Sequence, residues 1–183
     1  MNESPNNDQL LQDLVKRVEA LEREAPKNQL ALGVMSGDLD HTMAAFMVAL
    51  GATTFDMEVE MFFMFWGTAA LRDPKKKVEK EVLDSMFGMM LPNGAGELPV
   101  STMQSFGMGP SMLNFALKKH GAMSLEELIE EAGEAGVRIT VCAMSMDIMG
   151  IKREELIDYP HLTFAGVGTF VDMLGESKQC WFM

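Results

Sequence analysis

The stretch that decides the fold is VRITVCAMSMDIMG, residues 137–150. Its first half is a β-branched run without proline or glycine, and it is entered from Gly136. Such a run, preceded by a helical pattern, predicts a buried strand of a parallel sheet. The strand would end at Cys142, and open α/β sheets bind and react at the carboxyl ends of their strands. Cys142 is therefore the first candidate for a functional residue.

Two features of the surrounding sequence bear on the reactivity of Cys142. A helix starting near Ser145 or Asp147 would point its positive end at the thiol, but this is worth only about 0.3–1 kcal/mol. Met144 and Asp147 supply apolar and negative surroundings, which disfavour a thiolate. We therefore expect an accessible thiol without strong activation. The alternative is a buried strand cysteine that packs as a small hydrophobic side chain.

Strand and helix signals alternate along the rest of the chain. Short apolar runs predict strands at residues 30–35, 57–65, 137–142, 161–164 and 179–182. Helices with one apolar face are predicted between them, and the clearest begins with a capping box formed by Ser124 and Glu127. This alternation predicts the fold class α/β, as a three-layer α/β/α sandwich with a mainly parallel sheet of about five strands.

The N-terminal region differs in pattern from the rest. Residues 1–27 are predicted to form a polar tail and a short coiled-coil-like amphipathic helix, and residues 28–183 the α/β domain. Four apolar residues fall at a/d spacing, namely Leu11, Leu14, Val18 and Leu21. So short a helix is marginal alone, and it either lies on its own domain or pairs with another subunit. We expect a homo-oligomer.

The middle of the chain carries a further helix signal and a loop. Asp73 followed by proline is a good helix start, and apolar positions as far as Met90 predict one buried face. This helix would carry a basic patch of Lys75, Lys76, Lys77 and Lys80. The patch would be either a solvated face or a docking surface for an acidic partner. The Met- and Gly-rich segment 91–109 predicts a lid or a partner surface.

The composition excludes several classes of function. A net charge of −12 and a pI near 4.6 argue against sequence-independent nucleic-acid binding. Two cysteines and three histidines offer none of the usual zinc spacings, so no metal site is predicted. Gly166 and Gly168 resemble the start of a dinucleotide fingerprint, but Val171 stands in place of its third glycine, so no cofactor is predicted. The most apolar run, residues 61–71, is well short of the roughly 20 residues of a membrane helix. The polar start lacks the apolar region of a signal peptide, and a reducing cytoplasm is the expected setting.

Several predicted strand ends meet at one edge of the sheet, because the carboxyl ends of parallel strands lie together. Beside Cys142 we expect pocket residues from these ends, namely Ser36, Gly37, Asp38, Trp66, Gly67, Met144, Ser145 and Asp147. Gly37 permits a tight turn, and Asp38 can cap the helix that follows. The other cysteine, Cys180, is predicted to be structural, because no Cys-x-x-Cys spacing links it to Cys142.

The same segments carry a resemblance to a known family. Residues 136–157 with their core CAMSMDIMGI, GDLD at 37–40 and MFFMFWG at 61–67 are similar to the DsrE/DsrF-like family of sulfur-relay proteins. The similarity is to the branch often labelled peroxiredoxin-like, and it covers nearly everything after residue 28. In that family the equivalent cysteine is taken to carry sulfur as a persulfide. The resemblance transfers this role to Cys142 and to no other residue.

The resemblance implies a sulfurtransferase or sulfur carrier, with TusA-like carriers and rhodanese-like donors as partners. The rhodanese loop Cys-x-x-Gly-x-Arg itself is absent, because Ser145 and Asp147 stand in place of its glycine and arginine. One alternative is a thiol peroxidase, although no Pro-x-x-x-Thr-x-x-Cys pattern precedes Cys142. Another is a non-enzymatic oligomeric adaptor in which Cys142 is incidental.

Overall fold

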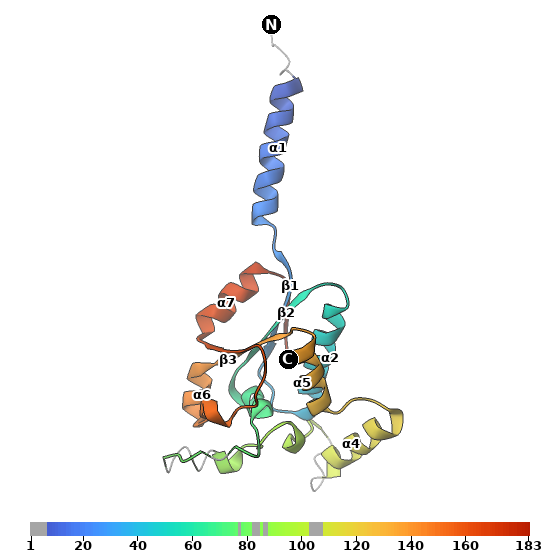
Figure 1. Ribbon diagram of the computed structural model, residues 1–183, viewed down its shortest axis with the longest axis vertical. Coiled ribbons are helices and arrows are strands. Elements are labelled where there is room, and N and C mark those ends of the chain that lie inside the picture. The colour runs from blue at the N-terminus through green and yellow to red at the C-terminus, as the bar shows by residue number, and fades with distance from the viewer. Residues whose placement is uncertain (1–6, 77, 82–84, 86–87, 103–107) are drawn as a thin grey trace.

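A five-stranded parallel sheet forms the centre of the protein (Figure 1). The computed structural model describes residues 7–76, 78–81, 85, 88–102 and 108–183. The strands are β1 Lys27–Val34, β2 Glu58–Phe63, β3 Arg138–Cys142, β4 Leu162–Ala165 and β5 Ser177–Phe182. They lie in the order β4-β3-β2-β1-β5, and every pairing is parallel. The predicted α/β fold class is confirmed.

Helices cover both faces of this sheet (Figure 1). The first face is covered by α2 Leu39–Thr53 and α5 Leu125–Glu134, and the second by α7 Val167–Glu176. The short α6 Ala143–Met149 follows β3 at the carboxyl edge, and its Met146 and Met149 pack in the same core cluster as α2 and α5. The 3-10 helices are η1 Phe65–Leu71, η2 Ala95–Glu97 and η4 Arg153–Glu155. Two further helices, α1 Asn7–Glu24 and α4 Met108–His120, project from the body.

The alternation of side chains along β3 divides the core in two. Ile139 and Val141 are fully buried in the large cluster beneath α2 and α5. Cys142 belongs to a smaller cluster on the opposite face, beneath α7. A single strand therefore supplies both layers of the core, and its last side chain points to the α7 side.

The capping box before β3 is formed as predicted. The Ser124 hydroxyl accepts a hydrogen bond from the Glu127 amide at 3.3 Å, and the Glu127 carboxylate accepts one from the Ser124 amide at 2.7 Å. The turn after α5 places Gly136 at a φ of 79°. Only glycine adopts this backbone readily, so the chain reverses there and enters β3.

The helix predicted from Asp73 does not begin there. Residues 73–76 and 78–81 are not helical. Of the described residues between 73 and 90, only 85 and 88–90 are helical. Buried ionic contacts hold this segment in another path. Glu155 binds Arg72 at 3.2 Å and Lys80 at 2.6 Å, and all three side chains are less than 10% exposed.

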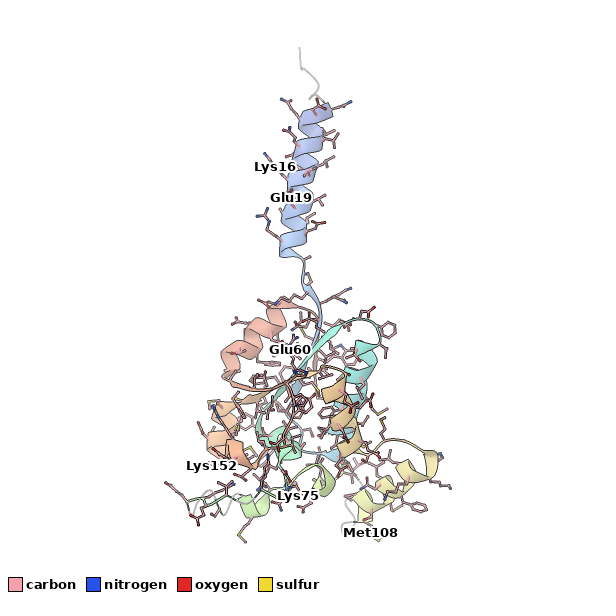
Figure 2. The ribbon with its side chains drawn as sticks, in the orientation of Figure 1. Lys16, Glu19, Glu60, Lys75, Met108 and Lys152 are labelled. Atoms are coloured by element: carbon pink, nitrogen blue, oxygen red, sulfur yellow. The ribbon has the colours of Figure 1, made fainter. Side chains whose placement is uncertain are left out.

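The predicted basic patch is consequently broken up. Lys76 donates to the Leu156 carbonyl at 2.8 Å and pairs with Asp158 at 2.7 Å. Lys80 points inward to Glu155, whereas Lys75 remains exposed at the surface (Figure 2). Lys77 lies outside the described residues, as do Val82, Leu83, Met86 and Phe87 of the expected apolar face.

Candidate functional site at the carboxyl edge of the sheet

Cys142 ends β3 at the carboxyl edge of the sheet, as its sequence position predicts. Val141 pairs with Phe63 of β2, and Cys142 pairs with Ala165 of β4. The next residue of β2 at this level is Met64, which belongs to the same buried cluster as Cys142. The thiol therefore stands in the row of residues where three neighbouring strands end.

The expectation of an accessible thiol is wrong. Cys142 is only 2% exposed and packs in an apolar cluster with Ala31, Phe62, Met64, Phe170 and Met173. The period of the strand turns its side chain to the α7 face, where α7 lies over it. This burial agrees with the alternative interpretation, in which Cys142 packs as a small hydrophobic side chain.

The cover over this cluster is built from α7 and the last strand. Phe170 stacks on Phe62 with ring centroids 4.8 Å apart, and Phe182 meets Phe170 edge-on at 5.3 Å. Gly33 leaves room for these rings, because a Cβ added there would lie 2.9 Å from ring atoms of both Phe170 and Phe182. The Met- and Gly-rich segment 91–109, predicted to be a lid or a partner surface, does not form this cover in its described part. Its described residues Leu91, Ala95, Leu98 and Val100 pack into the other core instead, and residues 103–107 lie outside the described residues.

The first two predicted strand ends do converge. The Gly67 amide donates to the Met35 carbonyl at 3.1 Å, so the ends of β1 and β2 are joined directly. A Cβ added at Gly67 would lie 2.6 Å from the Val34 carbonyl oxygen, and one at Gly37 would lie 3.0 Å from the Trp66 backbone oxygen. Both glycines are therefore required by the close approach of these two segments.

Asp38 takes a different role from the predicted cap. It occupies the N-cap position of α2, but its side chain makes no capping hydrogen bond. Its carboxylate instead accepts a hydrogen bond from the Ser36 hydroxyl at 2.6 Å and lies 3.3 Å from His41 Nδ1. These three residues form a half-exposed polar group at the end of β1.

The predicted residues of α6 separate into exposed and buried ones. Met144 is 53% exposed and Asp147 is also exposed, whereas Ser145 is completely buried. Among the described residues, two buried side-chain oxygens have no hydrogen-bond partner, Ser145 Oγ and Thr68 Oγ1. Ser145 lies three residues after Cys142, and Thr68 lies in η1, which contacts α6. A buried hydroxyl without a partner is costly, so each of these two oxygens could accept a hydrogen bond from a bound group or donate one to it.

The cation on the same face of β3 is already paired. Arg138 donates to Glu60 at 2.6 Å and to Glu58 at 3.0 Å, and Glu60 lies on the sheet (Figure 2). Burial lowers the pKa of Arg138 and the two glutamates raise it, with a net upward shift. The guanidinium therefore stays charged and is neutralised by carboxylates rather than by a thiolate.

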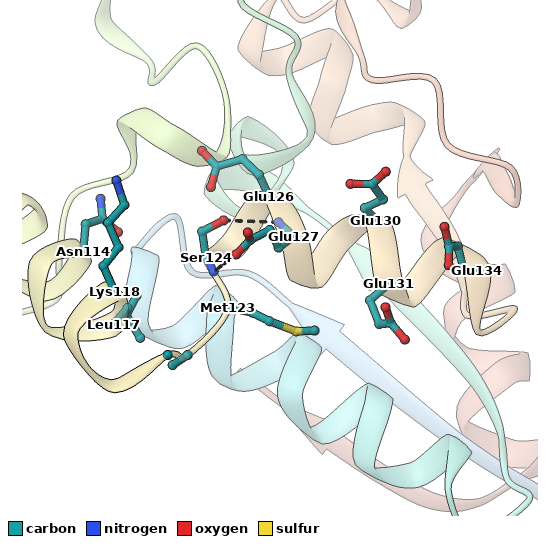
Figure 3. A pocket seen from close by; sticks show the side chains of 12 residues that line it. Asn114, Leu117, Lys118, Met123, Ser124, Glu126, Glu127, Glu130, Glu131 and Glu134 are labelled. Carbon is teal, nitrogen blue, oxygen red and sulfur yellow. Dashed lines mark hydrogen bonds between the residues drawn. The ribbon is translucent and has the colours of Figure 1, made fainter.

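Other features of the described residues lie away from the thiol. A groove of about 820 Å³ lies between α4 and α5, and its wall carries a row of glutamates (Figure 3). No group of three or more His, Cys, Asp or Glu side chains among the described residues could hold a metal ion. None of the described helices combines the length and apolar character needed to cross a membrane.

Known proteins are similar to this chain over the region that contains the sheet and Cys142. The chain matches the DsrE/DsrF/DrsH-like family over residues 26–182. It is 42% identical over 139 residues to the uncharacterized protein YrkE of Bacillus subtilis (strain 168), spanning 75% of this chain and 86% of that protein. It is 32% identical over 164 residues to the sulfur carrier protein DsrE2 of Allochromatium vinosum, spanning 86% of this chain and 99% of that protein. The family match leaves α1 outside.

Proposed function

The chain belongs to the DsrE/DsrF/DrsH-like family, and we propose that it is a sulfur-relay protein that holds sulfane sulfur as a persulfide on Cys142. The relative named as a sulfur carrier supports a role in sulfur relay. The observation that carries the finer proposal is the position of Cys142. It ends an inner strand of the sheet, and its side chain lies in an apolar cluster. Two buried hydroxyls that lack a partner among the described residues lie in α6, which follows Cys142 directly, and in η1, which contacts α6.

The proposed transfer is an exchange without net oxidation. The Cys142 thiolate attacks the outer sulfur of a donor persulfide, a new sulfur–sulfur bond forms at Cys142 Sγ, and the donor leaves as a thiol after taking up a proton. In the second step the thiolate of an acceptor attacks the outer sulfur, and Cys142 is released. TusA-like carriers and rhodanese-like proteins are the proposed partners, in the cytoplasm.

Burial gives the persulfide its lifetime and demands an opening step. An exposed persulfide would be reduced by cellular thiols, whereas the cluster of Phe62, Phe170 and Met173 keeps such thiols away. Because Cys142 is 2% exposed, loading and unloading require α7 to move aside. A partner that docks at this edge would supply the contacts that stabilise the open form.

Burial of Cys142 also favours a second candidate. A cysteine that only fills space in the core is compatible with a non-enzymatic adaptor, in which the fold and the projecting helices do the work. A thiol peroxidase has less support, because its thiolate needs an activating cation and Arg138 is already paired with Glu58 and Glu60.

Intact-protein mass spectrometry distinguishes these functions. The chain is incubated with inorganic polysulfide or with a persulfide-loaded rhodanese, and peroxide consumption is followed on the same sample. We expect the wild-type chain and Cys180→Ser to gain the mass of one or more sulfur atoms and to lose it to a reducing agent. Cys142→Ser should gain less, and any sulfur that its exposed Cys180 takes up from polysulfide should be lost to a small thiol at once. Equal loading of Cys142→Ser, or no loading of the wild type, contradicts the proposal, and rapid peroxide consumption supports the peroxidase.

A further inference from the structure

Helix α1 stands clear of the rest of the molecule. It projects from the body as an isolated rod, and residues 7–23 are all exposed (Figures 1 and 2). Six large apolar side chains are 49–68% exposed on it, namely Leu10, Leu11, Leu14, Val15, Val18 and Leu21. A single helix of this length is marginal in water. Since its own domain does not cover these side chains, their partner has to come from outside the chain.

The apolar residues of α1 follow the pattern of a coiled coil. Leu11 and Val18 occupy a positions, and Leu14 and Leu21 occupy d positions. Of the two a positions only Val18 is β-branched, and a β-branched residue at a with leucine at d favours two strands. We propose that α1 pairs in parallel with the α1 helix of a second copy of this chain.

The flanking residues decide the orientation of the pair. With Leu11 at a, Arg17 falls at g and Glu22 at the following e position. In a parallel pair, the g position of one helix faces the following e position of its partner. Arg17 of each copy therefore lies beside Glu22 of the other copy, which gives two such contacts in the dimer. In an antiparallel pair, g faces g and e faces e, and like charges would meet. Leu10 and Val15 occupy the preceding g and e positions. In a parallel pair, Leu10 of one copy would therefore pack against Val15 of the other.

The parallel pairing has a consequence for the position of the thiols. Helix α1 leads directly into the amino end of β1, and all strands run in the same direction. The carboxyl edge with Cys142 therefore lies at the end of the domain away from α1, as the places of α1 and α6 in Figure 1 show. Two copies joined by α1 keep both edges free. The inference does not depend on sulfur chemistry at Cys142.

Charge exchange on the full-length chain tests both the pairing and its direction. The dissociation constant of the dimer is measured by analytical ultracentrifugation. Arg17→Glu or Glu22→Arg alone should weaken the dimer by about tenfold, because two attractive contacts become repulsive. The double variant Arg17→Glu with Glu22→Arg restores attraction only in a parallel pair. The matched control is Lys16→Glu, which makes the same charge change at an outward f position and should leave the constant unchanged.

Cross-linking provides a second measurement that does not depend on charge. In the Cys180→Ser background, Leu21→Cys should form a disulfide-linked dimer under mild oxidation, because equivalent d positions face each other in a parallel pair. Lys16→Cys, at the outward position, should not. A wild-type chain that is monomeric at roughly 100 µM overturns the proposal. So does a dimer that is insensitive to the charge changes, or a double variant that stays as weak as the single ones.

Discussion

The ring of Phe170 in α7 stacks on the ring of Phe62 in β2, with centroids 4.8 Å apart and planes inclined by 24°. Both residues belong to the cluster that encloses Cys142. This pair therefore joins the helix to the sheet directly over the candidate site, and changes in it should affect the stability of the protein and the access to the thiol together.

Truncation of Phe170 is the first prediction. Phe170→Ala should lower the free energy of unfolding by about 3–5 kcal/mol, because the lost ring leaves a cavity between Phe62 and Phe182. Under native conditions Cys142 should then react faster with an alkylating reagent. The control is Val171→Ala in the same helix, whose side chain is 60% exposed. Unchanged reactivity of Cys142 in a folded Phe170→Ala protein would show that α7 does not control access.

The second prediction concerns the two cysteines. Cys180 is exposed, and it pairs with Ala31 of β1. The strand pairings place Cys142 level with Met35, which lies four residues further along the chain than Ala31. Three strand spacings separate β5 from β3, so the thiols are about 14 Å apart across the sheet and about 13 Å along it. A disulfide between them is excluded in the native fold. Peptide mapping after brief alkylation should find Cys180 modified first, and mild oxidation should yield no internal disulfide. Detection of that disulfide would revive the peroxidase hypothesis.

Local signals in the sequence were sufficient for the sheet and its neighbouring helices. The β-branched run of β3 and the capping box at Ser124 predicted the right elements, because each depends on residues within a few positions. The helix from Asp73 failed because Arg72 and Lys80 are held by Glu155, a contact across about 80 positions of sequence. No local pattern contains such a contact.

The same distinction applies to the candidate site. The position of Cys142 at a strand end followed from the sequence, but its burial depends on Phe170, which comes 28 positions later. Phe170 and Met173 are spaced as one face of a helix, and that spacing was the only local signal of the cover. Which face of the sheet a helix covers is decided by topology, so the exposure of the thiol could not be predicted.

The third prediction tests the buried ionic cluster that displaces the expected helix. Glu155→Ala leaves Arg72 and Lys80 buried without a counter-charge, which should cost about 3–5 kcal/mol in unfolding free energy. Its neighbour provides the control, because Glu154 is exposed and Glu154→Ala should change stability by about 0.5 kcal/mol or less. Urea denaturation measures both. Equal stability of the two variants would mean that Glu155 is dispensable.

The fourth prediction concerns acid stability. Burial raises the pKa of Asp40 and hydrogen bonds from Ser101 lower it, with a net value below the usual 3.8. A carboxyl group whose pKa is lowered on folding stabilises the protein fully above its unfolded pKa, and the contribution is lost as the pH falls through the folded pKa. Ser101→Ala should therefore cost about 1 kcal/mol at pH 7, and the difference from wild type should shrink below about pH 4. Thermal unfolding at several pH values measures it, with the exposed Ser111→Ala as control. A deficit that does not vary with pH would assign the effect to packing.

The last prediction concerns the hydroxyl group of Ser145. Its oxygen is buried without a partner, so its removal relieves an unpaired polar group. Ser145→Ala should leave the unfolding free energy unchanged or raise it by about 1–2 kcal/mol. If the hydroxyl contacts sulfur bound to Cys142, the same variant should load with sulfur but lose it to a small thiol faster than the wild type. Thr68→Val, which keeps the side-chain shape, should behave in the same way, whereas Ser36→Ala should not, because that hydroxyl already binds Asp38. A loss of stability in Ser145→Ala would mean that the hydroxyl serves the fold, and an unchanged rate of sulfur loss in both variants would remove Ser145 and Thr68 from the site.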